Sequence, residues 1–257
     1  MKKSTAEITS LEITSDNPIH QRLFFAYTCA KEYLEGDILE LGCGSGRGIE
    51  EVKSHVSTYT AIDKNDFHLG NLAKQYPDFT FHNSSFPPLT QCKENSFDRV
   101  ITFQVIEHIQ DDHNFMKEIH RVLKPGGKAL ITTPNIDTRL SRNPWHIREY
   151  KAQELYNLGK KYFNNVEIKG ITGNEKVMEY YERNKVSVNK IMKWDFLNLQ
   201  YILPASILKL PYEYLNRKNR NSLKDADDEL VKSIHYSDYH VIDDANKGLD
   251  LFLIVEK

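Results

Sequence analysis

The chain has 257 residues, of which 40% are hydrophobic, and its formal net charge at pH 7 is −2. That length accommodates one α/β domain with an appendage, and the near-neutral charge argues against a general affinity for nucleic acid. The three cysteines show neither a metal-ligand spacing nor a disulfide framework, which favours a reducing, cytoplasmic compartment.

The N-terminal residues are polar and lack the apolar core of a signal peptide. We expect residues 1–15 to form a flexible arm. Asp16, Asn17 and Pro18 then give a helix start, apolar side chains recur with helical spacing, and Gly36 stops the pattern. This predicts an amphipathic helix that packs beside the first strand.

Predicted strands and helices alternate over the next hundred residues. The strands lie near 37–41, 58–63, 79–82, 98–103 and 128–133, and the helices near 46–55, 66–76 and 112–123. Alternation of this kind predicts an α/β fold with a doubly wound, mostly parallel sheet and right-handed crossovers. A ligand of such a sheet lies at the carboxyl ends of its strands. A loop, a helix near 151–162 and a strand near 166–171 follow.

A glycine-rich loop follows the first strand. Gly42, Gly44 and Gly46 recur at every second position. A dinucleotide-binding loop requires its third glycine three residues after the second, and that position is Arg47. The loop also lacks the lysine that holds a triphosphate. It therefore predicts a nucleotide-type ligand that lies against bare backbone N–H groups but is not a dinucleotide.

Asp63 ends the second predicted strand, 21 residues after Gly42. A lone carboxylate at this position can accept hydrogen bonds from both hydroxyl groups of a ribose. The alternative is that Asp63 caps the helix that follows. We favour the ribose interpretation, because the carboxylate and the glycine loop fall at neighbouring strand ends.

At this point the sequence resembles the class I S-adenosylmethionine-dependent methyltransferases of the type 11/23 kind. ILELGCGSGRG resembles the first motif of that family, and residues 97–109 and 122–135 resemble its fourth-strand and fifth-strand segments. The resemblance implies a Rossmann-like, seven-stranded sheet built from 16–173 and 248–257, whose last strand, near 249–255, pairs antiparallel with its neighbours. It also implies that S-adenosylmethionine is the cofactor and that the chain is an enzyme.

The resemblance assigns cofactor contacts residue by residue. Glu40 orients the loop or meets the ammonium group of the cofactor, Lys64 flanks the adenine, and Asn83 or Ser84 replaces an acidic residue that the family often has there. Gln104 faces both cofactor and substrate. The full predicted set is Glu40, Gly42, Cys43, Gly44, Gly46, Asp63, Lys64, Asn83, Ser84 and Gln104.

The acceptor side is predicted from the loop after the fifth strand. His146 is the first candidate for a general base, and Arg148 and Tyr150 are candidate substrate contacts. A similar tract occurs in a branch of the family tied to polysaccharide and cell-surface metabolism. The alternative is that Trp145 and His146 only pin the loop to the core. His108 is the second candidate base, although a Glu-His pair at this position often braces the loop.

A run of acidic and histidine residues lies at the start of the helix predicted near 112–123. It comprises Glu107, His108, Asp111, Asp112 and His113. The spacing matches no standard metal site, and helix N-termini attract acidic residues. We therefore predict no metal.

Residues 174–247 form an insertion that the minimal fold does not need. Between 183 and 224 it has a local net charge of +7, from Arg183, Lys185, Lys190, Lys193, Lys209, Arg217, Lys218, Arg220 and Lys224 against Asp195 and Glu213. Its apolar run is too short for a membrane span, which takes about 20 residues. The insertion is either a helical lid that packs on the sheet or on a second subunit of a homodimer, or a peripheral membrane element. Acidic residues at 225–229 offer the basic stretch an internal partner.

These patterns together predict a methyltransferase that acts, at oxygen, on a small or a lipid- or saccharide-linked acceptor. A sulfonium methyl group is already activated, so the protein mainly aligns the reactants and excludes water. One alternative is a non-catalytic, cofactor-binding module that works through partners on the basic insertion. A weaker one is an RNA methyltransferase, because no nucleic-acid-binding module is visible.

Overall fold

The computed structural model describes residue 9 and residues 12–257. The chain divides into two compact units, each of which we describe by itself. The sheet unit comprises 26–137, 148–171 and 241–257, and the helical unit comprises the described residues up to 25 with 138–147 and 172–240. The sequence-based division differs from this one, because residues 138–147 and the first part of the N-terminal helix group with the insertion.

The sheet unit is built on a mostly parallel sheet with the strand order β3-β2-β1-β4-β5-β8-β6-β7. Pairs among β1 to β5 are parallel, whereas β8 pairs antiparallel with β5 and β6, as predicted for the last strand. The strands are β1 (Asp37–Leu41), β2 (Thr58–Asp63), β3 (Thr80–Asn83), β4 (Phe97–Phe103), β5 (Leu123–Pro134), β6 (Asn165–Gly173), β7 (Tyr239–Ile242) and β8 (Asp250–Glu256).

The predicted doubly wound fold is confirmed, with one strand more than expected. Seven strands were predicted, and the described residues form eight, because β7 arises inside the predicted insertion. β5 also begins earlier than predicted. Its first residue, Leu123, already pairs with Phe97 of β4, ahead of a shift in register.

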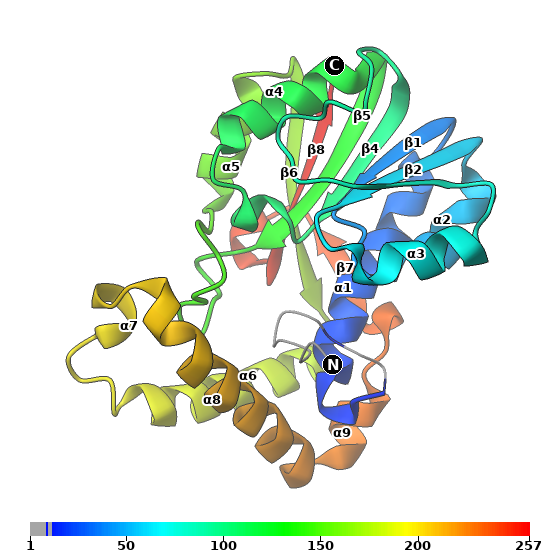
Figure 1. The fold of residues 1–257 in the computed structure, drawn as a ribbon. Coiled ribbons are helices and arrows are strands. Elements are labelled where there is room, and N and C mark those ends of the chain that lie inside the picture. Colours follow the sequence, from blue (N-terminus) through cyan, green and yellow to red (C-terminus); the bar gives the residue numbers. More distant parts are fainter. Residues whose placement is uncertain (1–8, 10–11) are drawn as a thin grey trace. The chain divides into compact units, whose positions relative to one another are not determined.

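Helices cover both faces of this sheet (Figure 1). α4 (Asp112–Val122) and α5 (Ala152–Lys160) lie on one face, and α2 (Ile49–Val52) and α3 (Asp66–Gln75) lie on the other. α4 shows why the sequence favours this packing. Phe115, Met116 and Ile119 recur on one side of the helix and are fully buried, and the Asp111 carboxylate caps its N-terminus.

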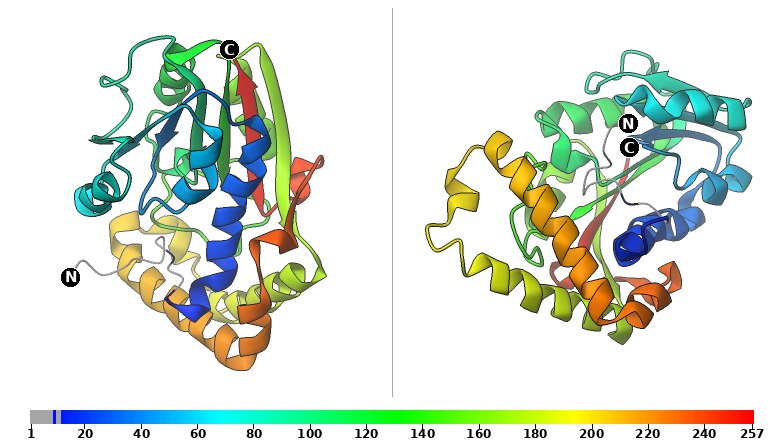
Figure 2. Two further views of the ribbon diagram at one scale, coloured as in Figure 1. Left: turned by 90° about the vertical axis from the view of Figure 1, so that its right-hand side faces the viewer. Right: turned by 60° about the horizontal axis from the view of Figure 1, so that its bottom comes forward.

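The helical unit holds the first part of α1 (Asn17–Ala30) together with α6 (Glu175–Met192), α7 (Leu199–Ile202), α8 (Ala205–Ala226) and α9 (Asp228–Ser233). Figure 2 shows α8, coloured gold to orange, beside α6 and α9. The carboxylate of Asp16 is fully buried and accepts hydrogen bonds from Arg217 at 2.6 Å and Arg220 at 3.0 Å, both on α8. This ion cluster fastens α8 to the start of α1.

The predicted arm at 1–15 falls mostly outside the described residues, which exclude 1–8, 10 and 11. Its described end is ordered into a short 3-10 turn, η1 (Thr14–Asp16). Ser15 is buried in that turn and donates a hydrogen bond to Asn221 of α8 at 2.8 Å. At its end, therefore, the expectation of a loose arm is wrong.

The acidic run after α8 does fold back on the basic stretch. Arg183 of α6 pairs with Asp227 at 2.8 Å, and Lys224 pairs with Asp225 and Asp228. Part of the +7 charge is thus neutralised inside the unit. Within the described part of the chain, no helix combines the length and the apolar character that crossing a membrane takes.

Candidate functional site

The glycine loop leaves the carboxyl end of β1 with its three predicted glycines at positive φ: Gly42 at 83°, Gly44 at 54° and Gly46 at 77°. A Cβ atom at Gly42 would lie 2.4 Å from Val105, and one at Gly46 would lie 2.6 Å from Leu72. A Cβ at Gly44 would meet no atom within 4 Å. Packing therefore requires glycine at 42 and 46, whereas Gly44 faces open space that a ligand can fill.

Asp63, at the end of β2, lies directly beside this loop. One carboxylate oxygen accepts from the backbone N–H of Gly44 and the other from that of Asn65, both at 2.8 Å. The helix-capping alternative is wrong in detail, because Asn65, not Asp63, is the N-cap residue of α3. Each carboxylate oxygen has a second lone pair, so Asp63 can hold the loop and still accept two ribose hydroxyls.

The end of β3 brings two more predicted contacts to the same place. Asn83 pairs in register with Asp63 across the two strands, and its side-chain amide donates to the Asp63 carbonyl at 3.2 Å. The backbone N–H of Ser84 donates to the same carbonyl at 3.0 Å. Lys64 follows Asp63 and is exposed. The structure thus gathers these residues with the glycine loop at one sheet edge.

Glu40 lies beneath the loop and is buried. One carboxylate oxygen accepts from the hydroxyl of Tyr27 at 2.7 Å, and the other accepts from the hydroxyl of Tyr59. Burial raises the pKa of Glu40, and the two hydroxyl donors act in the opposite direction. With 2% of its surface exposed, Glu40 has little area to offer a ligand. Of the two predicted roles, these contacts support the bracing of the loop, and a contact with the cofactor stays a prediction.

Cys43 is also a buried member of the predicted set, with 3% of its surface exposed. Desolvation raises the pKa of its thiol, and the nearby carboxylates of Glu40 and Asp63 raise it further. The thiolate is therefore scarce at neutral pH, so Cys43 contributes packing and backbone rather than a nucleophile.

Gln104 follows β4, the strand next to β1. Its φ is +58°, an uncommon conformation for a glutamine. The backbone N–H donates to the carbonyl of Thr132 at 2.9 Å, which holds the turn against β5. The next residue, Val105, is the one that contacts Gly42. Uncommon backbone conformations of this kind cluster at functional sites. The contact of Gln104 with cofactor and substrate stays a prediction.

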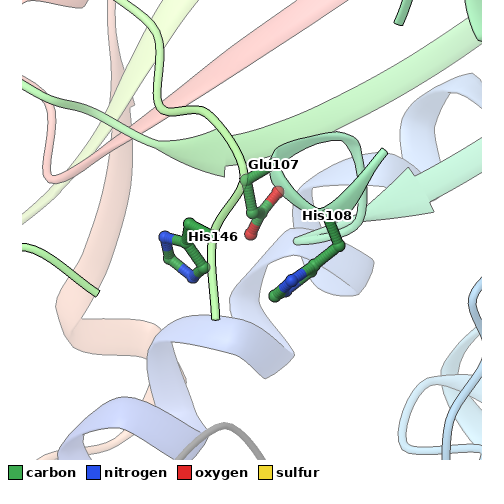
Figure 3. Close-up of side chains that lie close together, drawn as sticks. All are labelled: Glu107, His108 and His146. Carbon is green, nitrogen blue, oxygen red and sulfur yellow. The ribbon is translucent and has the colours of Figure 1, made fainter. Parts of the chain in front are cut away.

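The short turn η4 (Ile106–His108) follows. Glu107 is buried and accepts from the Thr133 hydroxyl of β5 at 3.0 Å, so it braces the loop. Figure 3 draws Glu107 and His108 on this turn together with His146, which belongs to the helical unit and is described with it below. The predicted role of His108 as a base stays a prediction.

Arg148 and Tyr150, the predicted acceptor contacts, share a buried partner. The Tyr150 hydroxyl donates to the Asp112 carboxylate at 2.8 Å, and the Arg148 guanidinium pairs with the same oxygen. Tyr150 is only 3% exposed, whereas the Arg148 side chain is 48% exposed. The placement of Tyr150 is that of a structural residue. Arg148 retains surface on which an anionic group can bind.

The remaining members of the predicted acidic and histidine run have protein partners of their own. Asp111 caps α4 by accepting from the N–H of Asn114, and His113 shares a hydrogen bond of 2.8 Å with the Tyr162 hydroxyl. The contact of Asp111 is that of a helix N-terminus, as the helix-terminus interpretation expects. That the protein needs no metal stays a prediction.

His146 lies on the segment of the helical unit between 138 and 147. Its Nε2 atom lies 2.8 Å from the side-chain nitrogen of Asn143, which can only donate, so the ring accepts there. The indole N–H of Trp145 donates to Glu213 of α8 at 2.8 Å, and Lys209 lies over the same indole ring. Trp145 therefore pins the segment to α8, whereas the alternative expected the core as the partner. The predicted role of His146 as a base stays a prediction.

The open space at Gly44 would accommodate the methyl group of an alanine without a clash. We expect Gly44→Ala to cost about 1–2 kcal/mol of unfolding free energy, because alanine is strained at φ +54°. Its methyl group would point into the ligand space, so affinity for S-adenosylmethionine should fall at least about tenfold, measured by calorimetry. Gly70→Ala on α3, where a Cβ also meets no atom within 4 Å, is the matched control. Unchanged affinity in Gly44→Ala would place the ligand elsewhere.

Comparisons with known proteins follow the geometry. A family model described as a methyltransferase domain matches residues 39–131. These residues contain every predicted cofactor contact and exclude His146, Arg148 and Tyr150. A Mycolicibacterium smegmatis protein named a probable S-adenosylmethionine-dependent methyltransferase is 35% identical over 147 residues, covering 54% of each chain. A ubiquinone biosynthesis O-methyltransferase of Caulobacter vibrioides is 29% identical and covers 49% of this chain and 46% of its own. The chain thus matches about half the length of these curated relatives.

A solved structure extends the likeness to the fold. A methyltransferase of Thermotoga maritima superposes with a TM-score of 0.57 at 14% identity and covers 93% of this chain and 91% of its own. At that identity it shows the fold alone. Three observations indicate the same kind of domain: the fold, the glycine loop with Asp63 beside it, and the residues that the family model matches. Residues 39–131 therefore match a methyltransferase domain, and the relatives that they resemble include proteins named as S-adenosylmethionine-dependent methyltransferases.

Proposed function

We propose that the protein transfers the methyl group of S-adenosylmethionine to an oxygen atom of a small or a lipid- or saccharide-linked acceptor. The observation that carries the proposal is the pairing of Gly44, which faces open space, with the carboxylate of Asp63 at 2.8 Å. Oxygen is favoured because a histidine that can serve as a general base, His146, follows β5. It is also favoured because one group of relatives is named as O-methyltransferases. The proposal includes the predicted cytoplasmic location.

The residues of the chain divide the work. When bound, S-adenosylmethionine supplies a methyl group that its sulfonium charge already activates. Asp63 accepts the ribose hydroxyls, the backbone at Gly44 lies under the ligand, and Gln104 borders the reaction space. Arg148 attracts an anionic acceptor group through the exposed half of its side chain, and His146 takes the proton from the attacking hydroxyl. The alignment of acceptor and methyl group supplies most of the acceleration.

A second candidate function is a cofactor-binding module without catalysis. The contact that favours it is the buried Asp112, which holds both predicted acceptor residues, Arg148 and Tyr150. The structure weakens the case for an RNA substrate. Four basic residues of the insertion form ion pairs with carboxylates of the same chain: Arg183, Arg217, Arg220 and Lys224.

The role of His146 separates catalysis from binding. We expect His146→Ala to lower turnover by about 100-fold, at the low end of the range for a general base, because the methyl group is already activated. Cofactor affinity should stay the same. His68→Ala, which changes a histidine on α3 of the sheet unit, is the control.

The test needs an acceptor, which can be found by incubating the protein and labelled cofactor with cytosolic, lipid and saccharide extracts. Extracts that gain label identify the acceptor class, and the variants are then measured on that acceptor. Wild-type protein that binds the cofactor but labels no extract would support the non-catalytic module. Full turnover in His146→Ala would remove the histidine from the mechanism and leave the methyltransferase proposal standing.

A further inference from the structure

The helix α8 exposes its apolar side and buries polar side chains, the reverse of an ordinary surface helix. Ile207, Leu210 and Tyr214 are spaced by three and four residues, so they lie on one side, and they are 58%, 82% and 67% exposed. Asn219 and Arg220, by contrast, are buried, in contact with α6 and Asp16. The inward side of α8 is thus held by polar contacts, and its apolar side is left to solvent.

The segment before α8 also exposes large hydrophobic side chains. Trp194 and Phe196 are 86% and 80% exposed, and Ile202 of α7 is 69% exposed. Ten of the thirteen large, exposed hydrophobic side chains among the described residues lie between 194 and 215. Such a concentration marks an interaction surface rather than the scattered exposure found on every protein. We call residues 190–218 the apolar-basic segment.

Positive charge accompanies these side chains. Lys190, Lys193 and Lys218 are exposed, and in the described part of the chain none of them has an ion pair. Lys209 lies 4.0 Å from the centre of the Trp145 ring and likewise has no carboxylate partner among the described residues. The basic residues outside this group are the ones that pair with internal carboxylates. What remains of the charge of the insertion is therefore concentrated where its apolar side chains are exposed.

This combination selects one class of partner. A symmetric contact with a second copy would bring the lysines of both copies together, which like-charge repulsion disfavours. A membrane interface with anionic headgroups takes both features, because lysines bind the headgroups while Trp, Tyr and aliphatic side chains enter the acyl boundary. We propose that the apolar-basic segment docks the protein on an anionic membrane surface, lying in the interface without crossing it.

Vesicle co-sedimentation of the full chain tests this docking. Vesicles of phosphatidylcholine containing phosphatidylglycerol should bind the protein, and binding should weaken as salt rises. Vesicles of phosphatidylcholine alone should bind it at least about tenfold more weakly. The double variants Trp194→Ser with Phe196→Ser, and Lys190→Glu with Lys193→Glu, should each lower affinity for the anionic vesicles at least about tenfold.

Matched controls come from the sheet unit. Phe67→Ser removes an aromatic side chain that is 61% exposed on α3, and Lys74→Glu reverses an exposed charge on the same helix. Both should bind the anionic vesicles like the wild type. Absence of vesicle binding, equal binding to neutral vesicles, or equal loss in the controls would overturn the proposal. The proposal would also be overturned if the protein binds no vesicles and sedimentation velocity shows a dimer that Trp194→Ser dissociates.

Discussion

The Asp63→Ala variant is expected to lose measurable binding of S-adenosylmethionine. Two hydroxyl groups that bond to a carboxylate contribute about 1.5–3 kcal/mol each, so the loss corresponds to a factor of at least about 100 in the dissociation constant. The substitution also frees the N–H of Gly44, which Asp63 holds at 2.8 Å, and so loosens the loop on which the ligand lies. Isothermal titration calorimetry measures the effect directly.

Two further variants separate binding from folding. Asp63→Asn keeps one carbonyl acceptor for the Gly44 N–H but removes the charge and the acceptor of the Asn65 N–H. It should lose less stability than Asp63→Ala and still bind at least about tenfold more weakly than the wild type. Asp66→Ala, in the first turn of α3, changes a neighbouring carboxylate and should bind normally. Near-normal affinity in a folded Asp63→Ala variant would remove the ribose assignment and, with it, the proposed location of the cofactor.

The sheet was predictable because its strands are local patterns. The central strands β1 and β4 contain apolar runs bounded by turn residues, and a buried parallel strand needs no more than that to be recognised. β7 (Tyr239–Ile242) escaped because four residues at the edge of a sheet carry no period that distinguishes them from a loop. Their pairing is visible only once the rest of the sheet is in place.

That the predicted cofactor residues lie together was predictable for a related reason. Gly42, Gly44 and Asp63 act through the backbone and through one carboxylate at adjacent strand ends, and the sequence fixes their order and spacing. The supports of the site were not predictable. Tyr27 and Tyr59 reach Glu40 from a helix and from a neighbouring strand, and nothing in the spacing of these residues indicates that both hydroxyls meet one carboxylate.

The acceptor side shows most clearly what the local sequence cannot predict. Arg148 and Tyr150 looked like ligand contacts, but Asp112, 36 and 38 residues away, pairs with both. In the basic insertion, too, the partners of the charged residues could not be predicted from the sequence. Its nine basic residues were counted together, yet Arg217 and Arg220 meet Asp16, about 200 residues earlier in the chain. Pairings over such separations depend on tertiary packing and leave no trace in local composition.

Asp16→Ala is expected to destabilise the helical unit by about 3–5 kcal/mol, because it leaves the guanidinium of Arg220, a side chain only 8% exposed, buried without its main counter-charge. The two tryptophans of the chain, Trp145 and Trp194, both lie in this unit. Tryptophan fluorescence during urea unfolding therefore reports on the helical unit and not on the sheet unit. The midpoint of that transition should fall to a much lower urea concentration.

Two variants identify the cause of the loss. Asp225→Ala removes an exposed carboxylate that pairs with Lys224 and should cost less than about 1 kcal/mol. Asp16→Ala combined with Arg220→Met should regain part of the stability that Asp16→Ala loses, because the double variant leaves no unpaired charge at the buried position. If Asp16→Ala unfolds at the wild-type midpoint, the ion cluster does not fasten α8. The exposed apolar side of that helix would then need another explanation.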